Sequence, residues 1–258
     1  MSQPGELGQI LGFLRRTEEA VCDEVLPTAH GAAMLTPSLP LVWQLNAIHV
    51  DDPHAEPYAL MREADEIQSR LAHRKLVVHD SELGERIAPA LARQGWNVFR
   101  LLVMVQRRAP ERRQAEGTGA ELERSVGAAA LAAFRREQPF GWQAAAVRQL
   151  AGMDERYGRV LEARDFGSPP EDPACACRLY MDAGLAQVDE VGTVEARRRR
   201  GHASAAVLAA SDHAQAAGRS PVFLLTDASD WPQQLYRRLG FDEIGVVHEF
   251  LKIPLGRP

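Results

Sequence analysis

The sequence predicts an α/β fold made of two related halves, and three observations predict it. Residues 185–253 alternate strand and helix patterns, which is typical of α/β architecture. Residues 74–106 repeat the pattern of residues 220–253: a strand, an Asp/Ser turn, a helix, a Gly-aromatic pair and a strand. A polar stretch containing Pro and Gly, residues 107–119, is typical of a linker between the halves. The composition, 45% hydrophobic and 25% charged, is that of a globular protein with a sizeable core.

The elements of the C-terminal half follow from apolar spacing and from residues that end or begin helices. Gly192 near the end of the first strand indicates a bulge or a close backbone approach. Gly218 suits the end of a helix, and Asp230 is a suitable N-cap for the next one. The expected elements are a strand at 185–194, a helix from Ala203 to Gly218, a strand at 222–226, a helix from Asp230 to Gly240 and a strand at 244–253.

The N-terminal half repeats the elements without the features of an anion site. Residues 31–35 and 41–50 resemble a hairpin, and an acidic stretch without glycine, "DDPHAEP", follows it. An anion would be repelled there. Pro89 is expected to kink or delay the helix that corresponds to the one ending at Gly240.

The segment "ARRRRGHAS", residues 196–204, has three interpretations: a solvated charge run, a nucleic-acid patch or a phosphate cradle. The net charge is −5, with 30 Lys and Arg against 35 Asp and Glu, so the long-range field does not favour a polyanion. The run falls between a strand and a helix, where unpaired amides and the positive end of the helix dipole stabilise an anion. We therefore favour a cradle for phosphate or pyrophosphate.

Two motifs in this half resemble those of the GNAT superfamily of acyl-CoA N-acyltransferases. Arg198-x-x-Gly201-x-Ala203 matches the family's Q/R-x-x-G-x-G/A loop, and "LYRRLGF" (235–241) matches its L-Y-x-x-x-G-F signature downstream. The resemblance runs from about residue 179 to residue 253. It implies two GNAT-like domains, each a mixed, mostly antiparallel sheet flanked by helices. Residues 1–108 would form a degenerate domain, 109–119 a linker and 120–258 the acyltransferase domain.

The resemblance also implies site residues. Tyr236 matches the tyrosine that protonates the departing CoA thiolate, and a phenol is a credible donor to it. Ser229 stands where the family commonly has an asparagine, seven positions before that tyrosine. The residues expected to bind acetyl-CoA are Val191, Gly192, Thr193, Arg198, Arg199, Arg200, Gly201, His202, Ala203, Ser204 and Ser229.

Two carboxylates are candidates for the general base that deprotonates an amine. Asp189 and Glu190 are adjacent on the strand, so strand alternation points them to opposite faces and only one faces the acyl site. We select Glu190, and a water chain is the alternative.

The expected function is transfer of an acetyl group from acetyl-CoA to a primary amine, either a small molecule or a peptide. A catalytically silent acyl-CoA-binding regulatory protein is the alternative, and nucleic-acid binding through the arginines is a third. Three cysteines, Cys22, Cys175 and Cys177, are too few for a disulfide framework and indicate a reducing cytoplasm. No metal site, signal peptide or membrane span is expected. An exposed sheet edge would allow a homodimer.

Overall fold

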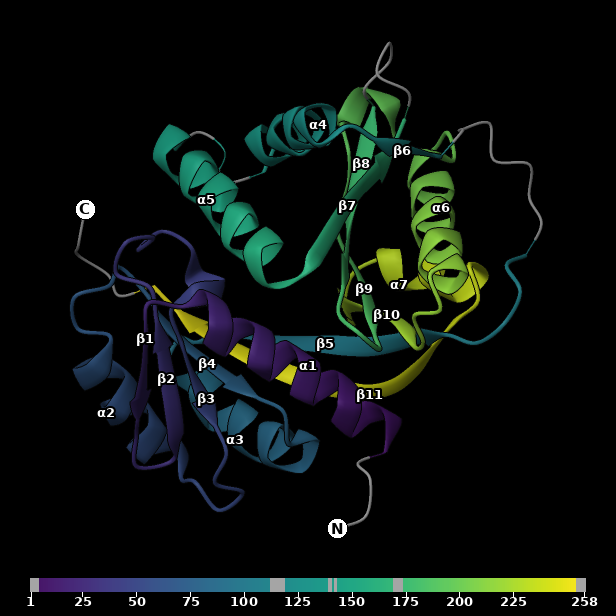
Figure 1. The fold of residues 1–258 in the computed structure, drawn as a ribbon. Coiled ribbons are helices and arrows are strands. Elements are labelled where there is room, and N and C mark those ends of the chain that lie inside the picture. Colours follow the sequence, from purple (N-terminus) through teal and green to yellow (C-terminus); the bar gives the residue numbers. More distant parts are fainter. Residues whose placement is uncertain (1–4, 112–118, 139–140, 142, 169–173, 254–258) are drawn as a thin grey trace. The chain divides into compact units, whose positions relative to one another are not determined.

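The computed structural model describes residues 5–111, 119–138, 141, 143–168 and 174–253. They form two compact units (Figure 1). Unit 1 contains the chain up to Val103, Thr226–Asp230 and the chain from Ile244 on, and unit 2 contains Met104–Leu225 and Trp231–Glu243. Two C-terminal segments thus belong to the first unit, whereas the sequence prediction assigned everything from residue 120 on to the second. Most of the predicted linker lies outside the described residues.

Figure 1 labels the helices and strands. The helices are α1 (Glu6–Val21), α2 (Pro57–Ile67), α3 (Ser81–Arg93), α4 (Arg124–Arg136), α5 (Ala144–Val160), α6 (His202–Ala216) and α7 (Pro232–Arg238). The strands are β1 (Glu24–Pro27), β2 (Gly31–Leu35), β3 (Ala47–Val50), β4 (Arg74–Val78), β5 (Asn97–Gln106), β6 (Ala120–Leu122), β7 (Glu162–Gly167), β8 (Cys175–Met181), β9 (Ala186–Thr193), β10 (Val222–Asp227) and β11 (Phe241–Lys252).

In unit 1 the strand order is β1-β2-β3-β4-β11. β3 pairs parallel with β4, and the β1–β2, β2–β3 and β4–β11 pairs are antiparallel. Alternation along β3 and β4 sends Ile48 and Leu76 into a core shared with Leu60 of α2 and Ile87 of α3. His49 points the other way and contacts Glu18 of α1, so helices cover both faces.

In unit 2 the strand order is β10-β9-β8-β7-β6. β9 pairs parallel with β10, and the pairs among β6, β7, β8 and β9 are antiparallel. α4 and α5 lie on one side of β7, β8 and β9, and α6 lies on the other side (Figure 1). Gly192 lets α4 approach the sheet, because a Cβ there would collide with Phe134. The predicted mixed, mostly antiparallel sheets flanked by helices are therefore present in both units.

The helix after the arginine run spans His202–Ala216, close to the predicted Ala203 to Gly218, and Gly218 just beyond its end has φ 72°. Three local predictions were wrong. The N-cap of α7 is Trp231 and not Asp230. α3 runs through Pro89 without interruption, and the strand expected at 41–50 is confined to Ala47–Val50, after a short 3-10 turn.

Among the described residues, no helix combines the length and the apolar character needed to span a bilayer.

Candidate functional site

The end of β9 carries a bulge. β9 pairs with β8 from Cys175↔Thr193 to Met181↔Ala186, and the register shifts between Ala176 and Arg178. Glu190, at this shift, has φ 53°, which a residue other than glycine seldom adopts. The bulge turns the backbone and side chains of β9 away from regular alternation.

β9 also separates from β10. Their parallel pairing covers only Val222↔Ala186 and Phe223↔Gln187, although β9 continues to Thr193. Along Val191–Thr193, one edge pairs with β8 and the other has no strand partner among the described residues. In unit 1 the corresponding pair does not separate, since β3 and β4 stay paired up to Val50↔Val78, their last residues.

The turn into α6 presents unpaired backbone amides. The Arg198 amide donates to the Glu195 carbonyl at 3.2 Å, and the Ala205 amide donates to the Gly201 carbonyl at 3.0 Å. The amides in between, from Arg199 to Ser204, donate to no acceptor among the described residues. Arg199 and Gly201 have φ 65° and 85°, so a left-handed turn brings the chain into the helix.

The side chains of this turn divide into anchored and free groups. Arg198 Nε donates to the Thr193 carbonyl at 3.1 Å, which fastens the turn to the end of β9. His202 Nδ1 lies 3.4 Å from Ser168 Oγ. Arg199 and Arg200 are exposed, and their guanidinium groups form no hydrogen bond or ion pair with a described residue. The turn therefore combines unpaired amides, a left-handed glycine and two free guanidinium groups, which suits an anion.

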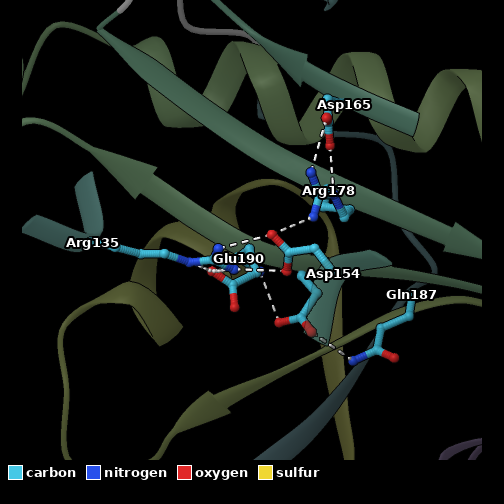
Figure 2. A network of polar contacts seen from close by, with 7 residues as sticks. Arg135, Asp154, Asp165, Arg178, Gln187 and Glu190 are labelled. Carbon is cyan, nitrogen blue, oxygen red and sulfur yellow. Dashed lines mark hydrogen bonds and ion pairs between the residues drawn. The ribbon is translucent and has the colours of Figure 1, made fainter. Parts of the chain in front are cut away.

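A buried charge network surrounds Glu190 (Figure 2). Arg135 of α4 lies within 3.0 Å of Glu190 Oε2 through Nη2 and binds Asp154 of α5 through two hydrogen bonds of 2.8 and 2.9 Å. Arg178 of β8 contacts Asp154 at 2.9 Å and binds Asp165 of β7. Two arginines therefore hold three carboxylates in a row, with Glu190 at one end.

The environment raises the pKa values of the carboxylates on β9. Burial raises the pKa of Glu190 to about 7, with Asp189 acting in the same direction, although Arg135 lowers it. Burial also raises the pKa of Asp189, whose Oδ1 accepts the Glu190 amide at 2.8 Å. A carboxylate with a pKa near neutrality is well matched to proton transfer at physiological pH.

The expectation that Asp189 and Glu190 point to opposite faces was wrong. Asp189 lies opposite Arg178 in the register, so both side chains leave the sheet on the face where Arg178 meets Asp154. Glu190 meets Arg135 of α4, which packs on that same face. The bulge breaks the two-residue alternation and brings both carboxylates to one side.

Tyr236 also belongs to unit 2, on α7. Its side chain is 7% exposed, and its ring lies 6.2 Å from the ring of Phe241, edge to face. Ser229, in contrast, belongs to unit 1, where its hydroxyl donates to Asp227 at 2.7 Å. The β9 end, the arginine turn and Tyr236 are therefore all in one compact unit, and Ser229 is not.

Arg135 and Asp154 were not among the site residues predicted from the sequence. The signal was present, because the buried face of α4 runs Gly127, Leu131, Arg135 at four-residue spacing, which places an arginine on an apolar stripe. Its partner Asp154 lies beside the buried Met153 in α5. A buried charge needs a partner, so the two signals would have been informative together.

Among the described residues, no group of His, Cys, Asp or Glu is arranged to hold a metal ion. No protein-family model matches the chain, and no curated protein matches it either.

Solved structures are similar over nearly the whole chain. A functionally unknown conserved protein from Staphylococcus epidermidis ATCC 12228 has a TM-score of 0.70 at 15% identity, covering 91% of this chain and 95% of its own. A GCN5-related N-acetyltransferase from Kribbella flavida has a TM-score of 0.60 at 16% identity, covering 94% and 95%. A tandem GNAT protein from the clavulanic acid biosynthesis pathway has a TM-score of 0.52 at 13% identity, covering 86% and 78%. The chain therefore has the GNAT fold in a tandem arrangement.

Proposed function

We propose that unit 2 transfers an acetyl group from acetyl-CoA to a primary amine. The observation that carries the proposal is the set of unpaired amides from Arg199 to Ser204 at the start of α6, next to the unpaired edge of β9. A pyrophosphate fits such a turn, because the amides, the helix dipole and the free arginines all favour negative charge. The free edge at Val191–Thr193 offers backbone groups to the amides of pantetheine, as an added strand would.

Glu190 supplies the base in this proposal. Oε2 of Glu190 is occupied by Arg135, whereas Oε1 forms no hydrogen bond or ion pair with a described residue and the side chain keeps 16% exposure. Oε1 takes a proton from the ammonium group of the acceptor, directly or through water, and the neutral nitrogen then attacks the thioester carbonyl. A new C–N bond forms and the C–S bond breaks.

Tyr236 completes the proposal as the acid. The departing sulfur carries the electron pair of the broken C–S bond and takes the proton of the Tyr236 hydroxyl. The second proton of the amine nitrogen returns to the Tyr236 phenolate, and Glu190 releases the first proton to solvent, so that the products are an amide, free CoA thiol and one released proton. Placement of Tyr236 in unit 2, with β9 and α6, supports this role.

The test is a thiol-release assay with acetyl-CoA and a panel of small amines, amino acids and peptides. We expect free thiol with one acceptor class, and mass spectrometry should find the matching acetylated product. Acetyl-CoA binding without thiol release for any acceptor would favour a silent acyl-CoA-binding protein. Salt-sensitive binding to DNA that CoA does not displace would favour the nucleic-acid alternative.

A further inference from the structure

The contacts of Glu190 distinguish its two carboxylate oxygens. Arg135 approaches Oε2 with Nε at 3.2 Å and with Nη2 at 3.0 Å, and the Arg135 side chain is only 4% exposed. A free glutamate side chain samples several rotamers, but one oxygen held by two nitrogens of a planar group has little freedom. The other oxygen, Oε1, is left for the acceptor.

Arg135 is itself fixed. Its Nη1 and Nη2 bind the two oxygens of Asp154 at 2.8 and 2.9 Å, in the fork geometry that guanidinium and carboxylate groups favour. Asp154 is in turn contacted by Arg178, which binds Asp165 through two hydrogen bonds of 2.6 and 3.0 Å (Figure 2). Each member is held by a neighbour from a different element, so Arg135 cannot turn away from Glu190 without breaking its two hydrogen bonds to Asp154.

We propose that Arg135, clamped by Asp154, is the positioning residue that holds the Glu190 carboxylate ready to accept the proton of the acceptor amine. This inference rests on the proposed function and deepens it, because it names residues of α4 and α5 that touch no substrate and yet set the state of the base. Lysine would keep the charge at position 135 but could not occupy Glu190 and Asp154 with a planar fork.

The charged groups that face Glu190 allow the inference to be tested through the pKa of Glu190. They come from Arg135 on α4, Asp154 on α5 and Asp189 on β9. Burial raises the pKa of Glu190 most, Arg135 lowers it, and Asp189 and Asp154 raise it. Removing Arg135 should therefore raise the pKa of Glu190, and neutralising Asp154 should lower it. A role in packing alone gives no such pair of opposite shifts.

The experiment compares Arg135→Gln, Arg135→Lys and Asp154→Asn with the unchanged chain. Two readouts are used: the acid limb of kcat/KM against pH, and the Glu190 carboxyl carbon followed by ¹³C NMR titration, with its signal assigned by Glu190→Gln. We expect the midpoint of the Glu190 titration to rise by about one pH unit in Arg135→Gln. At a pH on the acid limb, kcat/KM then falls about tenfold. Asp154→Asn should move the midpoint down, and Arg135→Lys should nearly keep it while kcat falls.

Asp65→Asn is the matched control, because Asp65 also binds a buried arginine, Arg74 at 2.9 Å, but both belong to unit 1 and neither is a member of the row. Its midpoint should stay in place. If circular dichroism shows that Arg135→Gln does not fold, the midpoints of Asp154→Asn and Arg135→Lys test the inference. Unmoved midpoints, or shifts of the same sign in Arg135→Gln and Asp154→Asn, would overturn the inference. Absence of acetyl transfer by the unchanged chain would overturn the proposed function alone, since the NMR titration needs no turnover.

Discussion

At the scale of single residues, a variant of Tyr236 distinguishes acetyl-CoA binding from catalysis of acetyl transfer. Tyr236→Phe removes one oxygen and keeps the ring that packs on Phe241. We expect acetyl-CoA affinity to change little and turnover to fall by about 10²- to 10⁴-fold, the usual worth of a general acid. The deficit should shrink towards pH 9, because a thiol with a pKa of about 8.5 then leaves without help. Acetyl transfer against pH, with calorimetry of CoA binding in parallel, measures both effects.

Tyr58→Phe is the matched control for that variant, since Tyr58 is 60% exposed and belongs to unit 1. It should behave as the unchanged chain does. Equal turnover in Tyr236→Phe and Tyr58→Phe across the pH range would remove Tyr236 from the proposed mechanism.

Individual residues also show how much of the candidate site can be predicted from the sequence. Glu190 was selected as the base from its neighbourhood alone, but the face it occupies depends on a bulge that strand alternation cannot predict. The residues that hold Glu190 in place are Arg135 and, through it, Asp154, which lie 55 and 36 positions away along the chain. Sequence spacing predicts local neighbours well, whereas a long-range contact needs the packing of α4 and α5 on the sheet.

At the scale of elements, the start of α6 is the proposed phosphate cradle. Gly201→Glu places a carboxylate among the unpaired amides and puts a side chain on a residue with φ 85°. We expect acetyl-CoA binding to be lost while the far-ultraviolet circular dichroism spectrum stays native. Isothermal titration calorimetry measures the binding.

Gly218→Glu controls for strain and charge, because Gly218 lies past the other end of the same helix, has φ 72° and would place a Cβ in open space. This variant should still bind acetyl-CoA. Equal binding by both glutamate variants would show that the ligand does not use the α6 turn.

Element predictions succeeded where a single local signal decides. The spacing of small residues and a helix-ending glycine were enough for α6, because such a helix packs one face on a sheet and must stop at Gly218. Element predictions were wrong where packing against other elements outweighs the local sequence signal. Pro89 lies within α3 because the helix's apolar face is buried, and Asp230 loses the cap of α7 to Trp231.

At the scale of the whole molecule, the two units differ in the strand separation on which the proposed acyl-CoA site depends. β9 separates from β10, whereas β3 stays paired with β4 to its last residue. α2 begins at Pro57 after Glu56, with no basic residue at its start, so no anion is favoured there. We expect calorimetry to give one acetyl-CoA per chain, and Gly201→Glu to give none. Two acetyl-CoA molecules per chain would contradict the assignment of unit 1 as degenerate.

The division into units was only partly accessible from the sequence. A repeat indicates two related halves, but it cannot show that the chain from Ile244 on belongs with the first half. β11 pairs with β4 from His248↔Val78 to Lys252↔Arg74, a contact between strands about 170 positions apart in the sequence. Lys75 of β4 contacts Glu249 of β11 at 2.9 Å, but the sequence shows two such charges as partners only once the strands are known to be neighbours.

The stability of unit 1, and with it the cooperative unfolding of the chain, should depend on pH through His73. This side chain is fully buried, its Nε2 lies 3.1 Å from the Asn46 carbonyl, and burial lowers its pKa from 6.5 to about 4. The unfolded chain therefore binds a proton that the folded chain does not, so stabilisation is complete above pH 6.5 and is lost as pH falls towards 4. At pH 5 the loss is about 2 kcal/mol relative to pH 7. Urea unfolding at both pH values should show a decrease smaller by that amount in His73→Gln, and an equal decrease in the two chains would rule out this titration.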